Sequence, residues 1–207
     1  DMLHTNYINA MIKGPKNIII AATKGGIILI DEKDGSFTRL GKEKISRVYN
    51  EEIIDIYYSN DILWIGSING FYSYNMKSEE FIDYTELFSA IDSEITGIRC
   101  IFSEDENSDI LWLGGNNKGG LIKFNKKTNE VKNFPHDIND NTSITYNSVN
   151  TIVKDDDGNI WVGADCGLNK FNIETESFEN FSKKDGLGSN VIKSMAFDKV
   201  NNYLWIT

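Results

Sequence analysis

A tryptophan flanked by aliphatic residues recurs along this chain of 207 residues and constrains its fold more than any other feature. The sites are Leu63-Trp64-Ile65-Gly66, Leu111-Trp112-Leu113-Gly114, Ile160-Trp161-Val162-Gly163 and Leu204-Trp205-Ile206. Successive tryptophans are separated by 48, 49 and 44 residues. A degenerate copy, Ile18 to Ala21, precedes the first of them. A recurring period of this length indicates a protein built from stacked structural repeats.

The residues around each tryptophan also keep a common order. A glycine-containing turn and a short apolar stretch end in Asp31, Asn75, Asn125 or Asn172. Six positions later stand Phe37, Phe81, Val131 and Phe178, and three positions beyond these stand Leu40, Tyr84, Phe134 and Phe181. Each copy begins with a β-branched apolar run, so it contains four short apolar segments divided by turn residues. Such segments are typical of antiparallel strands.

Four strands in each repeat of about 45 residues are the pattern of a β-propeller blade. We therefore predict an all-β fold, an incomplete arc of about four and a half blades. The blades are expected at 1–44, 45–94, 95–147 and 148–189, with half a blade at 190–207. Residues two apart share a face of a strand. We therefore expect Gly66, Gly114 and Gly163 to leave room for the buried indoles of Trp64, Trp112 and Trp161. The indole of Trp205 is expected to be buried as well.

The chain starts at Asp1 without a leader and ends within the predicted strand of Trp205. We expect it to be a piece of a longer polypeptide. A propeller needs closure because exposed strand edges pair with other chains. Either further blades of the same polypeptide complete the ring, which we favour, or the piece forms a homodimer.

The stretch from Ser143 to Phe181 resembles the two-component regulator propeller repeat. The resemblance runs from Ser143-Ile144-Thr145-Tyr146-Asn147-Ser148-Val149 through the Asp155–Asn159 turn to Trp161, Gly163 and Gly167. Ile19, Ala21 and Thr207 depart from the pattern. The resemblance implies a propeller, typically seven-bladed, in the extracytoplasmic part of a membrane-bound sensor. Such sensors often continue into a β-sandwich, a membrane helix and a histidine kinase, and several are associated with oligosaccharides.

Composition excludes several other classes. The formal charge of −10 argues against a nucleic-acid-binding surface, which needs a basic stripe. No apolar run is long enough for a membrane span. Two cysteines cannot staple a small scaffold, and an aromatic content of 12% argues against disorder.

Catalytic constellations are scarce. The only histidines are His4 and His136, which nothing spaces as metal ligands. The Asp155-Asp156-Asp157-Gly158 run lacks the distant Glu of a calcium loop and is interpreted as a hairpin turn. Cys100 is expected to be a small buried hydrophobe and Cys166 an exposed thiol, although a disulfide between them stays open. We predict no catalytic residue, no metal site and no cofactor.

A binding surface is the more plausible functional feature. In a propeller, the loops that enter the inner strands and the turns between second and third strands share one face around the central channel. The candidate ligand-binding residues on these segments are Tyr7, Arg47, Tyr49, Asn69, Arg99, Asn117, Tyr146, Asn147 and Asp165. Aromatic rings and amides suit a hydroxyl-rich ligand such as an oligosaccharide. Alternatively, Asn residues here only shape turns.

Three functions are compatible with these sequence features. The first is a non-catalytic sensor segment that binds a glycan or another small polar ligand and signals through output domains of the same polypeptide. The second is a propeller lyase or hydrolase whose catalytic groups lie partly in further blades. The third is a scaffold for protein contacts or dimerisation.

Overall fold

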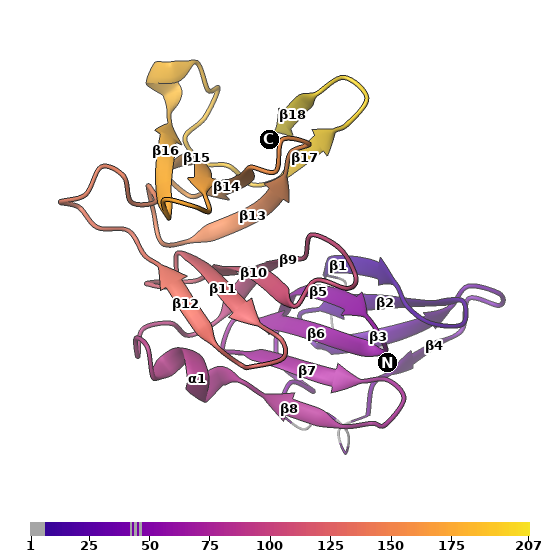
Figure 1. The fold of residues 1–207 in the computed structure, drawn as a ribbon. Coiled ribbons are helices and arrows are strands. Elements are labelled where there is room, and N and C mark those ends of the chain that lie inside the picture. The colour runs from indigo at the N-terminus through magenta and orange to yellow at the C-terminus, as the bar shows by residue number, and fades with distance from the viewer. Residues whose placement is uncertain (1–6, 42, 44, 46) are drawn as a thin grey trace.

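A computed structural model describes residues 7–41, 43, 45 and 47–207. These residues form four four-stranded antiparallel sheets and one two-stranded sheet, arranged along an arc (Figure 1). This confirms the predicted all-β fold and the incomplete propeller. The described helices are α1 (Thr85–Ser89) and a 3-10 turn at Lys183–Asp185. No helix in the described part of the chain has the length and apolar character needed to cross a membrane.

Each sheet takes its strands in chain order from the inside of the arc to the outside. The first sheet contains β1 (Ile8–Lys13), β2 (Ile18–Thr23), β3 (Gly26–Asp31) and β4 (Phe37–Arg39). The second contains β5 (Ile53–Ser59), β6 (Ile62–Ser67), β7 (Phe71–Asn75) and β8 (Phe81–Asp83). The third contains β9 (Ile98–Phe102), β10 (Ile110–Gly115), β11 (Leu121–Asn125) and β12 (Val131–Phe134).

The fourth sheet contains β13 (Val149–Lys154), β14 (Ile160–Ala164), β15 (Gly167–Asn172) and β16 (Ser177–Phe181). The fifth consists of β17 (Met195–Asp198) and β18 (Tyr203–Ile206). The apolar run from Val191 to Phe197 favours one continuous strand, but β17 begins only at Met195. The reason is that the chain first pairs with the preceding sheet, where the Ile192 amide donates to the Ala164 carbonyl at 3.0 Å.

The fixed six-residue spacing of the repeat comes from one recurring turn. In the second sheet, Asn75 Oδ1 accepts from the Lys77 and Ser78 amides, both at 2.9 Å. Glu79 then takes a left-handed conformation, with φ of 62°. Asn125 and Asn172 accept in the same way. Because this Asx turn has a fixed length, the fourth strand begins at or next to the residue six positions later.

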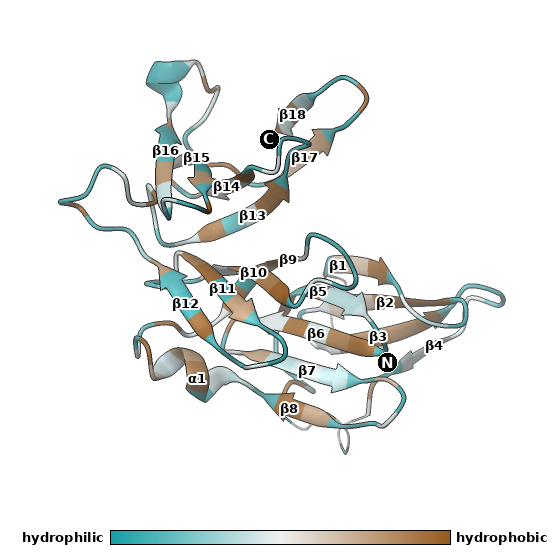
Figure 2. Cartoon of the chain, in the orientation of Figure 1, coloured by the Kyte–Doolittle hydropathy of each residue, from teal (hydrophilic) through white to brown (hydrophobic). Residues whose placement is uncertain are grey.

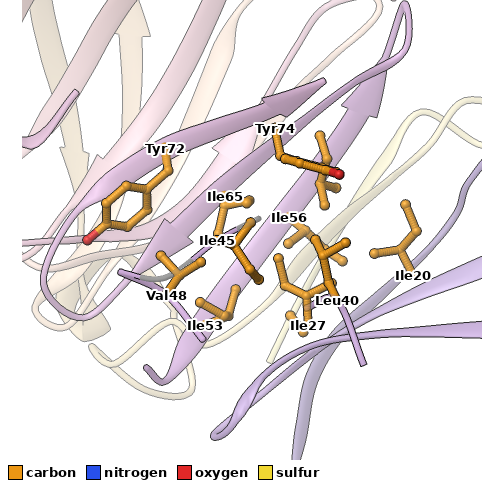
Figure 3. Packing of buried hydrophobic residues seen from close by; sticks show 12 residues of the cluster. Ile20, Ile27, Leu40, Ile45, Val48, Ile53, Ile56, Ile65, Tyr72 and Tyr74 are labelled. Atoms are coloured by element: carbon orange, nitrogen blue, oxygen red, sulfur yellow. The ribbon is translucent and has the colours of Figure 1, made fainter. Parts of the chain in front are cut away.

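The hydrophobic core lies between neighbouring sheets. Figure 3 shows the first of these layers, where Ile20 and Ile27 of the first sheet face Ile53, Ile56 and Ile65 of the second. All five side chains are buried. Figure 2 shows the brown of hydrophobic residues along middle strands such as β3, β6 and β10, whereas β7, with its tyrosines and serine, is pale. Each sheet is therefore stable only against a neighbour.

The tryptophans become more exposed towards the end of the chain. Trp64 and Trp112 are 2% exposed, as expected. Trp161 is half-buried, and Trp205 is 61% exposed, so the expected burial of Trp205 is wrong for this chain. The third strand of the following sheet covers the indole, through Phe124 on Trp64 and Phe171 on Trp112. The two-stranded fifth sheet supplies no such ring to Trp161, and no described sheet follows Trp205.

The expected role of the repeat glycines is also wrong. A Cβ atom on Gly66 would lie 2.8 Å from the Ile98 carbonyl oxygen, and one on Gly114 would lie 2.8 Å from the Val149 carbonyl oxygen. A Cβ on Gly163 would lie 2.5 Å from a methyl group of Ile192. The glycines therefore leave room for the chain entering the next sheet, and not for an indole.

Candidate functional site

The inner strands of successive sheets line a cavity of about 440 Å³ at the axis of the arc. The lining residues come from β1, β5, β9 and β13 and from the segment that leads into β17. They are Asn9, Ile54, Asp55, Arg99, Cys100, Ile101, Asn150, Thr151, Ile152, Lys193 and Ser194. Polar and charged groups thus gather at the axis, whereas the spaces between sheets are apolar. We call this cavity the axial channel.

A β-bulge in each inner strand directs one side chain into the axial channel. The ladder to the second strand skips one residue near the start of β1, β5, β9 and β13. The skipped residues are Asn9, Ile54, Arg99 and Asn150. A bulged residue has no ladder partner, and its side chain is re-aimed relative to its neighbours. The same backbone device therefore presents an amide, an alkyl group and a guanidinium to one space.

Two of these bulge residues join neighbouring sheets. Asn9 Nδ2 donates to the Ile53 carbonyl at 2.7 Å, and Asn150 Nδ2 donates to the Ile192 carbonyl at 2.9 Å. Both acceptors belong to the segment that enters the next sheet. The amide groups of Asn9 and Asn150 therefore act as axial links of the fold.

Asp55 makes the axial link between the second and third sheets. Its Oδ2 accepts from the Ile101 amide at 2.7 Å, and its Oδ1 accepts from the Ile56 amide at 2.9 Å. Burial raises the pKa of Asp55 to about 6, against the lowering effect of these two hydrogen bonds. The link therefore contains a carboxyl group whose pKa lies between the ordinary value for aspartate and neutral pH.

Asp165 lies beside the channel and is well supplied with donors. Its Oδ1 accepts from Asn150 Nδ2 at 2.8 Å and from Lys193 Nζ at 3.1 Å. Burial alone would raise the pKa of Asp165, but those hydrogen bonds and the charges of Lys193 and Arg99 lower it. Asp165 therefore stays ionised and holds Lys193 at the channel.

Arg99 differs from the other charged groups of the channel. The sequence predicts it in an entering loop, but it lies within strand β9, because the bulge turns it towards the axis from inside the sheet. The residue is half-buried. In the described part of the chain, its guanidinium makes no hydrogen bond or ion pair, although its charge acts on Asp165 and Cys100.

The loops at one mouth of the channel lie as the propeller interpretation requires. The Ile68 amide donates to Glu52, the Asn116 amide to Gly97 and the Asp165 amide to Ser148, at 3.3, 3.1 and 3.1 Å. Each bond joins a turn between second and third strands to the loop that enters the same sheet. These two sets of segments therefore share one face.

Several residues predicted for ligand binding are used by the fold itself. The Tyr49 ring stacks under the Arg39 guanidinium at 3.8 Å, and the Tyr49 carbonyl oxygen accepts from Arg39. Asn117 Nδ2 donates to Thr96 Oγ1 at 3.0 Å, and Asn117 has a left-handed φ of 52°. Asn147 Oδ1 accepts from the His136 amide at 2.7 Å. These side chains shape loops on the mouth face.

The remaining predicted residues are exposed. Tyr7 and Tyr146 present 64% and 47% of their surface, and Asn69 is exposed in its turn. The Tyr7 ring lies 4.5 Å from Lys24 Nζ, and Arg47 forms an ion pair with Asp83. Together with Asp165, these residues give the mouth face two available rings and several polar groups.

The other sequence candidates have structural surroundings. His136 is half-buried, with Nδ1 2.7 Å from the Ile144 carbonyl oxygen, while His4 lies outside the described residues. Asp155 accepts from Asn159 and from Trp161 Nε1 at 2.8 Å, as the turn interpretation predicts. Cys100 is buried, Cys166 is exposed, and both are free thiols. The described residues contain no cluster of three potential metal ligands.

Sequence reasoning misses the residues that line the channel from within the strands. Asp55, Asn9 and Asn150 are absent from the candidates because an apolar inner strand is not expected to present polar groups. Lys193 is absent for the same reason, although it lies in the segment that leads into β17. A signal is available when the repeats are aligned. Asn9, Arg99 and Asn150 each stand one position after the first apolar residue of their inner strand, where a strand buried on both faces would not need a polar group.

A family model described as two component regulator propeller matches residues 143–165. Over 171 residues, 81% of the chain, the sequence is 25% identical to a protein of Formosa agariphila named histidine kinase P4. The chain spans only 12% of that protein.

Solved structures give the same fold. The extracellular domain of a putative hybrid two-component system from B. thetaiotaomicron aligns with 97% of this chain at a TM-score of 0.75 and 24% identity, and the chain covers 26% of it. The extracellular domain of a putative one-component system from the same organism aligns with 99% at a TM-score of 0.55 and 15% identity, with 32% of that chain covered. A β-propeller domain from Myceliophteria thermophila aligns with 100% at 0.68 and 9% identity, with 63% covered. The chain is therefore an incomplete arc of a β-propeller, in which residues 143–165 match the two-component regulator propeller repeat.

Proposed function

We propose that this chain is a non-catalytic ligand-sensing segment in the extracytoplasmic part of a membrane-bound bacterial signalling protein. The observation that carries the proposal is the similarity, over almost the whole chain, to an extracellular domain of a hybrid two-component system. The similarity to a protein named histidine kinase P4 supports a kinase output domain elsewhere in the same polypeptide.

The ligand that suits the mouth face of the propeller is an oligosaccharide or another small polar molecule. The exposed rings of Tyr7 and Tyr146 can stack on the apolar face of a sugar, and the amides and charges nearby can pair with hydroxyl groups. The axial channel is lined by the inner strands that these loops enter. Binding there would alter contacts between inner strands, and this offers a route by which a ligand changes the arrangement of the blades.

A glycan array tests this proposal, followed by calorimetry on any hits. The array is probed with this chain and with the complete propeller in which it lies. We expect hits whose binding weakens by about fivefold or more in a Tyr146→Ala variant, since an aromatic stacking contact is worth about 1 kcal/mol or more. Binding to no glycan by either protein would contradict the proposal. Lys77→Gln, in an exposed hairpin turn, is the matched surface control.

A further inference from the structure

The repeat provides an internal standard for the residue that each inner strand turns towards the axis. In β1 and β13 that residue is an asparagine whose Nδ2 group links two sheets. In β9 the same bulge position holds Arg99. Arg99 does not make the corresponding link, because the Val149 carbonyl is approached instead by the thiol of Cys100, at 3.9 Å. The fold therefore places a guanidinium at the axis without using it structurally.

The hydrogen-bond inventory of the channel is unbalanced towards donors. Both oxygens of Asp55 accept from backbone amides, and Oδ1 of Asp165 accepts from Asn150 and Lys193. Three of these four carboxylate oxygens are thus engaged, and none of the bonds comes from Arg99. The guanidinium of Arg99 offers five N–H groups, and none of them donates to a described residue. A half-buried guanidinium in this state fits an anion supplied from outside.

The remaining free groups of the channel indicate what else the ligand carries. Asn9 and Asn150 use their Nδ2 groups in the axial links, while their Oδ1 atoms have no partner in the described part of the chain. These oxygens can accept from ligand hydroxyl groups. Lys193 pairs with Asp165 and adds a second positive charge at the channel edge.

From this arrangement we infer that the axial channel binds the carboxylate of an acidic sugar, with Arg99 as the bidentate anchor and the amide oxygens of Asn9 and Asn150 as hydroxyl acceptors. The planar fork of arginine matches a carboxylate in two parallel hydrogen bonds. The inference rests on the proposed function. It adds a ligand class and moves the specific contact from the mouth loops into the channel.

The test uses two ligands that differ only at C6, D-glucuronate and D-glucose, titrated into the chain and observed by ligand-detected NMR and calorimetry. We expect glucuronate to bind about tenfold more tightly or better, because it alone gains the charge-assisted pair. Arg99→Gln is expected to abolish this preference, whereas Arg99→Lys retains part of it. Lys77→Gln makes the same charge change on an exposed hairpin and is expected to retain all of it.

Thermal unfolding of each variant shows whether it is folded. If Arg99→Gln does not fold, Arg99→Lys still tests the inference. Equal affinity for the two sugars in the original chain, or an unchanged preference in Arg99→Gln, would overturn the inference. Binding of neutral glycans that is indifferent to Arg99 would overturn it while leaving the proposed function standing. Binding of no sugar at all, neutral or acidic, would count against both.

Discussion

The junction between the second and third sheets and the junction between the fourth and fifth sheets share one axial design but differ in aromatic packing. At the first of these junctions, Phe71, Tyr84 and Phe124 surround the Trp64 indole, and Phe88 packs on Phe71 and Phe124. At the second, Trp161 stacks mainly on Phe181 of its own sheet. Both junctions retain a hydrogen bond between inner strands. The difference shows that axial linking and outer aromatic burial are separate contributions to blade stacking.

The largest effect is expected when the buried indole is removed. Trp64→Ala leaves a cavity inside an aromatic cluster and should lower the free energy of unfolding by about 4 kcal/mol. Trp205→Ala removes an indole that is 61% exposed and should cost less than about 1 kcal/mol. Urea denaturation followed by circular dichroism measures both. Equal costs would show that the surroundings of the indole do not set its contribution to blade stacking.

The two axial links should differ in their response to pH, because one contains a carboxyl group and the other an amide. The pKa of Asp55 is raised from 3.8 to about 6 in the folded chain. Between these values the folded chain holds a proton that the unfolded chain has lost. The contribution of Asp55 to stability is therefore full below pH 4 and falls as pH rises through 6.

The change amounts to at most about 3 kcal/mol, reduced by the water that reaches this partly exposed residue. Asp55→Asn lacks the titration. The difference in urea midpoint between Asp55→Asn and the original chain should therefore move in favour of the variant from pH 4 to pH 7. Asn150→Asp would place a carboxyl group at the junction between the fourth and fifth sheets and serves as the complementary variant. A constant difference across this pH range would contradict the assignment of the raised pKa to Asp55.

The repeat glycines of the two junctions lie against different atoms of the chain entering the next sheet, a backbone carbonyl at Gly66 and a side-chain methyl group at Gly163. Alanine at position 66 would meet the Ile98 carbonyl at 2.8 Å, and a backbone atom cannot be moved cheaply. Alanine at position 163 would first meet methyl groups of Ile192 and Thr151, at 2.5 and 2.7 Å. These β-branched side chains are stiff, but they can shift more than a backbone carbonyl. We expect Gly66→Ala to cost about 3 kcal/mol and Gly163→Ala about 2 kcal/mol. Gly188→Ala, with no atom within 4 Å, should have almost no effect on the unfolding midpoint.

The features that repeat could be predicted from the sequence, and those that depend on a neighbouring sheet could not. The Asx turns and the four strands of each sheet follow from residues within one period. The role of Gly66 depends on Ile98, which lies 32 positions later in another sheet, so spacing within the motif pointed to the wrong partner. Exposure of Trp205 depends on which sheets are present. The channel residues were missed because a bulge changes the face of one residue without changing the apolar character of its strand.

The smallest expected effects concern the axial links, and they decide whether such links are equivalent along the arc. Asn9→Ala removes one hydrogen bond, to the Ile53 carbonyl, and should cost about 1 kcal/mol. Asn150→Ala removes the bond to Ile192 and also the bond to ionised Asp165, and should cost about 2 kcal/mol. The order of the two urea midpoints tests this difference, with Asn141→Ala as the control, since Asn141 is exposed and its side chain makes no hydrogen bond to a described residue. A larger loss for Asn9→Ala would mean that the aromatic layer of a junction, and not its axial hydrogen bonds, determines how much each link contributes.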